Sequence, residues 1–97
     1  MDKKNQQQYK RDLYKAILTL KNDDEVAAFL EDVCTIKEVN DMSQRLAVAK
    51  MLSDGCVFSE IGRITGTSSA TISRVNKCLE YGSGGYKVVI DRLYGNK

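Results

Sequence analysis

The sequence predicts an all-α protein that folds as a single domain over residues 1–97. Proline is absent, and the seven glycines lie between residues 55 and 95, so the first half of the chain lacks the turn residues that separate strands. Apolar residues recur at the three- and four-residue spacing of amphipathic helices. A monomer of this length buries only about two-thirds of its unfolded surface, and such marginal burial favours a dimer.

Two helices are expected in the first third of the chain. The first covers residues 6–21. Its apolar stripe is Tyr9, Leu13, Ile17 and Leu20. Asn22 and Glu25 then have the spacing of a capping box. In this motif the N-cap side chain accepts a hydrogen bond from a free backbone N–H, and an acid three positions later accepts one from the N-cap residue. The second helix follows. Its apolar face is Val26, Phe29, Leu30 and Val33.

A longer third helix begins at a second capping box. Thr35 and Glu38 supply the preferred Thr-x-x-Glu form, and the helix is expected to run to about Ser53. Asp54 and Gly55 end it. The apolar residues along it are Val39, Met42, Leu46, Ala49 and Leu52.

Residues 58–74 predict a helix-turn-helix. Gly66 stands where a first helix must end, since glycine readily adopts the left-handed conformation found there. Ser68 or Ser69 can cap the second helix, and Gly62 leaves room for that helix to approach. Inward residues are expected to be Phe58, Ile61 and Ile64 on the first helix and Ile72, Val75 and Leu79 on the second.

A flexible linker at residues 81–85 leads to the last expected helix, residues 86–93. The run Lys87 to Ile90 has strand propensity, but the apolar positions fit a helical face better than an alternating strand. Those positions are Tyr86, Val89, Ile90 and Leu93.

The second helix of the helix-turn-helix has an outward face that suits DNA. Small polar side chains near a helix N-terminus let the backbone approach base edges, and basic residues further along reach phosphates. We expect Ser69, Ala70 and Thr71 at base edges and Ser73, Arg74 and Lys77 at phosphates. The reading head is expected to span about residues 57–80. An ordinary αα-hairpin is the alternative, but a merely solvated helix more often carries a mixture of Glu and Lys.

Charge is unevenly distributed along the chain. Residues 1–15 carry five basic and two acidic groups, residues 16–45 three basic and seven acidic, and residues 46–97 seven basic and four acidic. A polyanion would therefore meet the C-terminal half, and the formal net charge of +2 is too small for indiscriminate coating of nucleic acid.

Composition also bears on the other function classes. No histidine is available as a base or a zinc ligand, and no serine has a recognisable activating partner, so neither an enzyme nor a metal or cofactor site is expected. The three cysteines form no C-x-x-C pair, which suits a reducing compartment. No stretch has the length of a membrane span or the pattern of a signal peptide. A cytoplasmic location is expected.

The motifs together resemble the Trp repressor superfamily, specifically the small Trp-repressor-related proteins. The strongest match is Gly66 to Arg74, with its core Ala70-Thr71-Ile72-Ser73-Arg74, and the second is Ser43-Gln44-Arg45 with the helix that follows to Gly55. The similarity covers residues 35 to about 80. It implies a six-helix domain whose outer helices intertwine in a homodimer. It also implies a transcriptional regulator, here a repressor, that binds a palindromic operator in double-stranded DNA.

The resemblance further implies a possible effector pocket. Family members hold tryptophan between two arginines, which correspond to Arg45 and Arg74, and a partner-subunit threonine corresponds to Thr35. Two positions depart from the pattern. Val75 replaces a glycine that leaves room for the ligand, and Cys78 replaces a serine that binds its amino group. Because valine adds volume and a thiol is a weak hydrogen-bond partner, DNA binding is not expected to require tryptophan.

Simpler roles stand beside those of the pocket. Arg45 can pair with Asp41 on its own helix, Arg74 can bind phosphate, and Thr35 can serve as a cap alone. The competing function is a helical protein–protein module that keeps the fold without specific DNA binding. Residues 82–85 would favour that module if they swung the last helix out as an arm.

Overall fold

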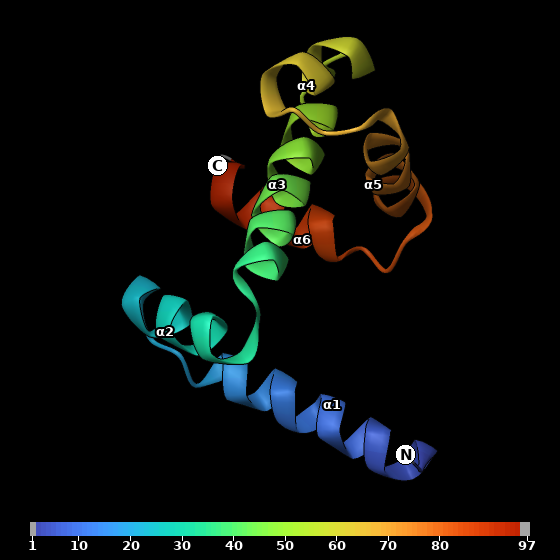
Figure 1. The fold of residues 1–97 in the computed structure, drawn as a ribbon. Helices are drawn as coiled ribbons and strands as arrows, with labels where there is room; N and C mark the ends of the chain where they lie inside the picture. The colour runs from blue at the N-terminus through green and yellow to red at the C-terminus, as the bar shows by residue number, and fades with distance from the viewer. Residues whose placement is uncertain (1, 96–97) are drawn as a thin grey trace. The chain divides into compact units, whose positions relative to one another are not determined.

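Six α-helices make up the chain between residues 2 and 95, the part that the computed structural model describes (Figure 1). They are α1 (Lys3–Leu18), α2 (Asp23–Val33), α3 (Ile36–Ser53), α4 (Phe58–Thr65), α5 (Ser69–Tyr81) and α6 (Gly85–Tyr94). No strand occurs in this range. The all-α prediction with six helices is confirmed.

The first helix lies three residues earlier than predicted. It begins at Lys3 because the Asp2 carboxylate accepts a hydrogen bond from the Lys4 N–H at 2.9 Å. It ends at Leu18, where the backbone tightens and the Thr19 hydroxyl donates to the Ala16 carbonyl at 2.6 Å. The predicted bounds of 6–21 missed both ends because a stripe of apolar residues marks a helical face but not its capping residues.

Of the two predicted capping boxes, one forms in full and the other forms in part. Ahead of α3, the Glu38 N–H donates to Thr35 Oγ1 at 3.0 Å and the Thr35 N–H donates to Glu38 Oε1 at 2.7 Å. Ahead of α2, the Glu25 N–H donates to Asn22 Oδ1 at 2.9 Å, while the Glu25 carboxylate accepts from Lys21 rather than from Asn22 itself. Each box satisfies backbone donors that a helix start leaves free.

The chain divides into two compact units, residues 1–39 and residues 40–97, with the boundary inside α3. The first unit holds α1, α2 and the start of α3, and none of its described residues is buried. Tyr9, Leu13 and Ile17 are 53%, 40% and 45% exposed. The apolar faces of these helices are therefore uncovered within a single chain.

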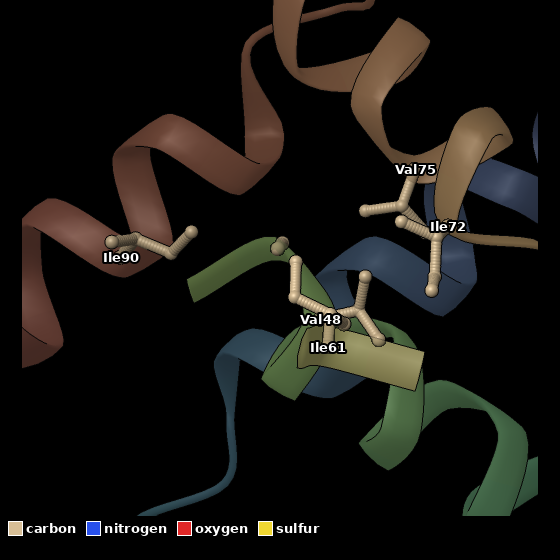
Figure 2. Packing of buried hydrophobic residues seen from close by; sticks show 6 residues of the cluster. Val48, Ile61, Ile72, Val75 and Ile90 are labelled. Carbon is tan, nitrogen blue, oxygen red and sulfur yellow. The ribbon is translucent and has the colours of Figure 1, made fainter. Parts of the chain in front are cut away.

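The second unit contains the hydrophobic core, to which four helices contribute (Figure 2). The buried residues are Val48 and Ala49 of α3, Ile61 of α4, Ile72 and Val75 of α5, and Ile90 of α6. Burial of Ile72 and Val75 confirms the predicted inner face of α5. The predicted inner face of α4 is correct only for Ile61, because Phe58 and Ile64 remain exposed in the single chain. Helical spacing also failed to indicate Val48, which lies beside the expected stripe.

The last helix packs onto this core. Ile90 is buried with the other core residues, and Tyr86 packs against the cluster from one turn earlier in α6. In this structure the segment 82–85 thus joins two packed helices. The last helix is therefore not swung out as an arm, the conformation that would have favoured the alternative function.

Two glycines of the helix-turn-helix should respond oppositely to alanine. Gly66 has φ +72°, so a residue with a Cβ is strained there even though the space is free. A Cβ on Gly62 would lie 3.5 Å from the Thr67 carbonyl oxygen and 3.8 Å from Ile72 Cδ1, which are normal contacts. We expect Gly66→Ala to destabilise by about 1–2 kcal/mol and Gly62→Ala to stabilise by up to about 1 kcal/mol.

Urea unfolding of both variants at one protein concentration checks this expectation. A loss of stability in Gly62→Ala as large as that in Gly66→Ala would show that close approach, and not backbone conformation, governs both positions. The structure already indicates that α5 could approach α4 equally well with a small side chain at position 62.

Candidate nucleic-acid interface

The reading head has the geometry of a helix-turn-helix. α4 ends at Gly66, whose left-handed backbone lets its N–H donate to the Gly62 carbonyl at 2.9 Å. α5 begins after Ser68, whose hydroxyl accepts a hydrogen bond from the Thr71 N–H at 3.2 Å. Of the two serines considered as the cap, Ser68 is the one that the structure selects. Only three residues separate the helices, so their relative direction is set within this short turn.

A polar network fills the turn. The Thr65 hydroxyl lies 2.7 Å from both the Ile61 carbonyl oxygen and Thr67 Oγ1, and the Thr67 N–H donates to Thr65 Oγ1 at 3.2 Å. Because a hydroxyl has one hydrogen, Thr67 supplies the proton of the bond between the two threonines when Thr65 donates to Ile61. Thr67 is 8% exposed, so a hydrogen-bonded side chain occupies the centre of the turn.

The outward face of α5 contains the residues predicted to meet DNA. Ser69, Ala70, Ser73, Arg74 and Lys77 are exposed, while Thr71 is half-buried. Its hydroxyl lies 3.2 Å from that of the capping Ser68. The helix carries no acid before Glu80, near its C-terminal end. This face therefore combines small polar groups with two cations, and no carboxylate from the same helix lies among them.

The residues of the implied effector pocket lie in different surroundings. Val75 is only 1% exposed and belongs to the core. Cys78, one turn further along α5, lines an apolar groove of about 590 Å³ together with Leu46 of α3 and Tyr86 of α6. Arg45 is half-buried on α3. Thr35 belongs to the first unit, where it forms the cap of α3.

One contributor to the reading head was missed from the sequence. Gln44 of α3 donates from Nε2 to the Thr65 carbonyl oxygen at 2.9 Å, across 21 residues of chain. In the sequence, Gln44 is notable only as part of the family match Ser43-Gln44-Arg45. No local pattern relates a side chain on one helix to the last carbonyl of another, so sequence reasoning had no signal for this contact.

Neither a metal-binding cluster nor a membrane-spanning helix is found within residues 2–95. No group of three His, Cys, Asp or Glu residues in this range could hold a metal ion. Among the helices of the described chain, none has the length and apolar character needed to cross a membrane.

Comparison with known proteins identifies the family. Residues 8–94 match the family model described as the Trp repressor protein. The chain belongs to the Trp repressor family. An uncharacterized relative from Bacillus subtilis strain 168, YerC, is 46% identical over 81 residues, which covers 84% of this chain and 78% of the relative.

Solved structures place the fold in the Trp repressor family as well. A TrpR-like protein from Eubacterium eligens superposes with a TM-score of 0.87 at 49% identity, over 93% of this chain and 94% of the other. A Staphylococcus aureus protein described as a candidate Trp repressor gives a TM-score of 0.84 at 41% identity, over 90% and 87% of the two chains. The Trp repressor family suggests a helix-turn-helix regulator rather than an enzyme.

Proposed function

We propose that this protein is a sequence-specific DNA-binding transcriptional regulator. It acts in the cytoplasm as a homodimer, represses by binding a palindromic operator, and does not require tryptophan. The exposed face of α5 carries this proposal. Its first three turns present hydroxyls and two cations to solvent, while the opposite side of the same helix is locked into the core by Ile72 and Val75.

The recognition surface is proposed to divide into two parts. Ser69, Ala70 and Thr71 lie at the start of α5, where the backbone itself can approach base edges. Ser73, Arg74 and Lys77 follow one turn later and hold phosphates. Phosphate contacts release counterions and so give binding its salt dependence, whereas base contacts give it discrimination.

Lys77 and Thr71 test this division. Lys77→Ala should weaken binding to all duplexes and lower the salt slope by about one unit, and Thr71→Val should relax discrimination at one position of each half-site by about 1–3 kcal/mol. Fluorescence anisotropy with a duplex selected by the native protein from a random library, and with its single-base variants, measures both effects.

Lys21→Ala is the matched control, since it removes the same charge from an exposed site between α1 and α2. Its salt slope should equal that of the native protein. If Lys77→Ala and Thr71→Val both left binding to the selected duplex unchanged, the proposed face would be wrong.

A homodimer is proposed because the first unit leaves its apolar faces uncovered. Helices without any buried residue gain little from packing, and an isolated helix of this length is marginal in water. A second copy supplies apolar surface of the same kind, and a symmetric pair presents two recognition helices about 34–36 Å apart, one turn of duplex.

Sedimentation at micromolar concentration should give a mass of twice 10.9 kDa. Leu13→Asp should weaken the dimer because it brings a charge into the proposed interface. Gln7→Asp, with the same added charge on the other side of α1, should not. A stable, folded native monomer would contradict the proposal.

A further inference from the structure

We infer that Gln44 is a positioning residue, which holds the turn of the helix-turn-helix against α3 and thereby sets the pose of α5 on DNA. The inference deepens the proposed function and rests on it for the DNA part. Its basis is the hydrogen bond from Gln44 Nε2 to the Thr65 carbonyl oxygen, 2.9 Å long and partly buried. Both residues lie in the second unit.

The acceptor of this bond is a group that α4 leaves free. The last four carbonyls of a helix lack an intrahelical partner. Gly66 donates to the Gly62 carbonyl, so the turn satisfies that group but not the carbonyl of Thr65. Gln44 supplies the missing donor from a different helix. The end of α4 is thus fastened to α3 by a directed polar contact as well as by the packing of Ile61.

The contact reaches the recognition helix through the threonine network. Thr65 bonds Thr67 through both the side-chain hydroxyl and the backbone N–H of Thr67. Thr67 directly precedes Ser68, the cap of α5. The proposed base-reading residues follow immediately at the start of that helix. A displacement of the turn would therefore move them, and a recognition site loosened by even about 1 Å loses function.

Three full-length variants test this role. Gln44→Met removes the donor at nearly the same size without adding charge. Gln44→Glu removes it when ionised, but a protonated carboxyl can donate again at lower pH. Gln7→Glu adds the same charge at an exposed position of α1 and serves as the control.

The first measurement is amide hydrogen exchange in the free protein, each variant compared with native protein at the same pH. At pH 7.5 we expect the amides of Gly66 and Thr67 to exchange about fivefold faster in both Gln44 variants, the size that one net hydrogen bond gives. The amide of Ala49 in the core should exchange as in the native protein. At pH 5 the difference should shrink for Gln44→Glu alone.

The second measurement is the affinity for a duplex that the native protein selects from a random library. We expect about a fivefold loss per reading head for both Gln44 variants at pH 7.5, with partial recovery at pH 5 for Gln44→Glu only. A role limited to stability would change the unfolding midpoint without this matching pH dependence of affinity. Gln7→Glu should bind as the native protein does at both pH values.

Two results would overturn the inference. If the amides of Gly66 and Thr67 exchanged at the native rate in both variants, Gln44 would not hold the turn. If they exchanged faster while the affinity for DNA stayed at the native value, Gln44 would cap α4 without positioning α5. A native protein that selects no duplex would overturn the proposed function and the DNA part of this inference together. The exchange rates would then still decide whether Gln44 fastens the turn.

Discussion

The purified protein should bind its selected duplex equally well with and without L-tryptophan. Val75 is the reason. Val75 stands where the family pattern has a glycine, it is 1% exposed, and it belongs to the buried cluster that also holds Ile72 and Val48 (Figure 2). A ligand that needed this space would have to displace a packed side chain, and overpacking of this kind costs about 1–3 kcal/mol. That penalty weakens a ligand by about 5- to 150-fold.

Cys78 adds to the effect. The thiol lines an apolar groove with Leu46 and Tyr86, and it offers an amino group only a weak hydrogen-bond partner. In the pocket that the resemblance implies, Arg45 and Arg74 remain to flank a ligand, but Val75 and Cys78 stand where the family pattern has the residues that shape and anchor the indole.

Calorimetric titration with L-tryptophan, paired with operator binding in its presence and absence, measures the expected independence. Saturable binding at micromolar ligand with a matching gain in DNA affinity would contradict it. The double variant Val75→Gly, Cys78→Ser should gain tryptophan binding if the pocket mapping holds. Because Val75 belongs to the core, Val75→Ala, Cys78→Ser is the milder companion, and thermal unfolding of both shows how much stability each change removes.

The helices could be predicted because their signals are local. Thr35 and Glu38 mark the start of α3. Gly66 marks the end of α4, and Ser68 marks the start of α5. Each of these residues acts through hydrogen bonds to residues only a few positions away. The bounds of α1 were missed because Asp2, its cap, precedes the apolar stripe by several residues. The exposed side of α5 could also be predicted locally, because the spacing of the apolar residues within the helix shows which side faces away from the core.

Contacts between helices could not be predicted in the same way. Helical spacing shows that Phe58 and Ile64 share a side with Ile61, but it does not show which of the three a neighbouring helix covers. The bond from Gln44 to Thr65 depends on how α3 and α4 cross, which no spacing along the chain encodes. Contacts that depend on how two helices cross can be identified only from the structure.

Ile61→Ala should be among the most damaging single changes to the reading head. Ile61 is fully buried, and it packs in the cluster to which α3, α5 and α6 also contribute. Truncating a buried isoleucine to alanine costs about 2–5 kcal/mol, because transfer energy is lost and a cavity remains. Since folded domains are stable by only about 5–15 kcal/mol, this loss removes a large part of the total. Urea unfolding at a fixed protein concentration measures this loss.

Ile64→Ala is the matched control, with the same residue type on the same helix but 56% exposed. A surface change of this kind usually stays within about 0.5 kcal/mol. The contrast also shows whether a second copy covers this side of α4, because such a contact would make Ile64→Ala costly as well. Equal, small losses at both positions would mean that α4 is not held by its inner face, and the core that positions α5 would have to be reassigned.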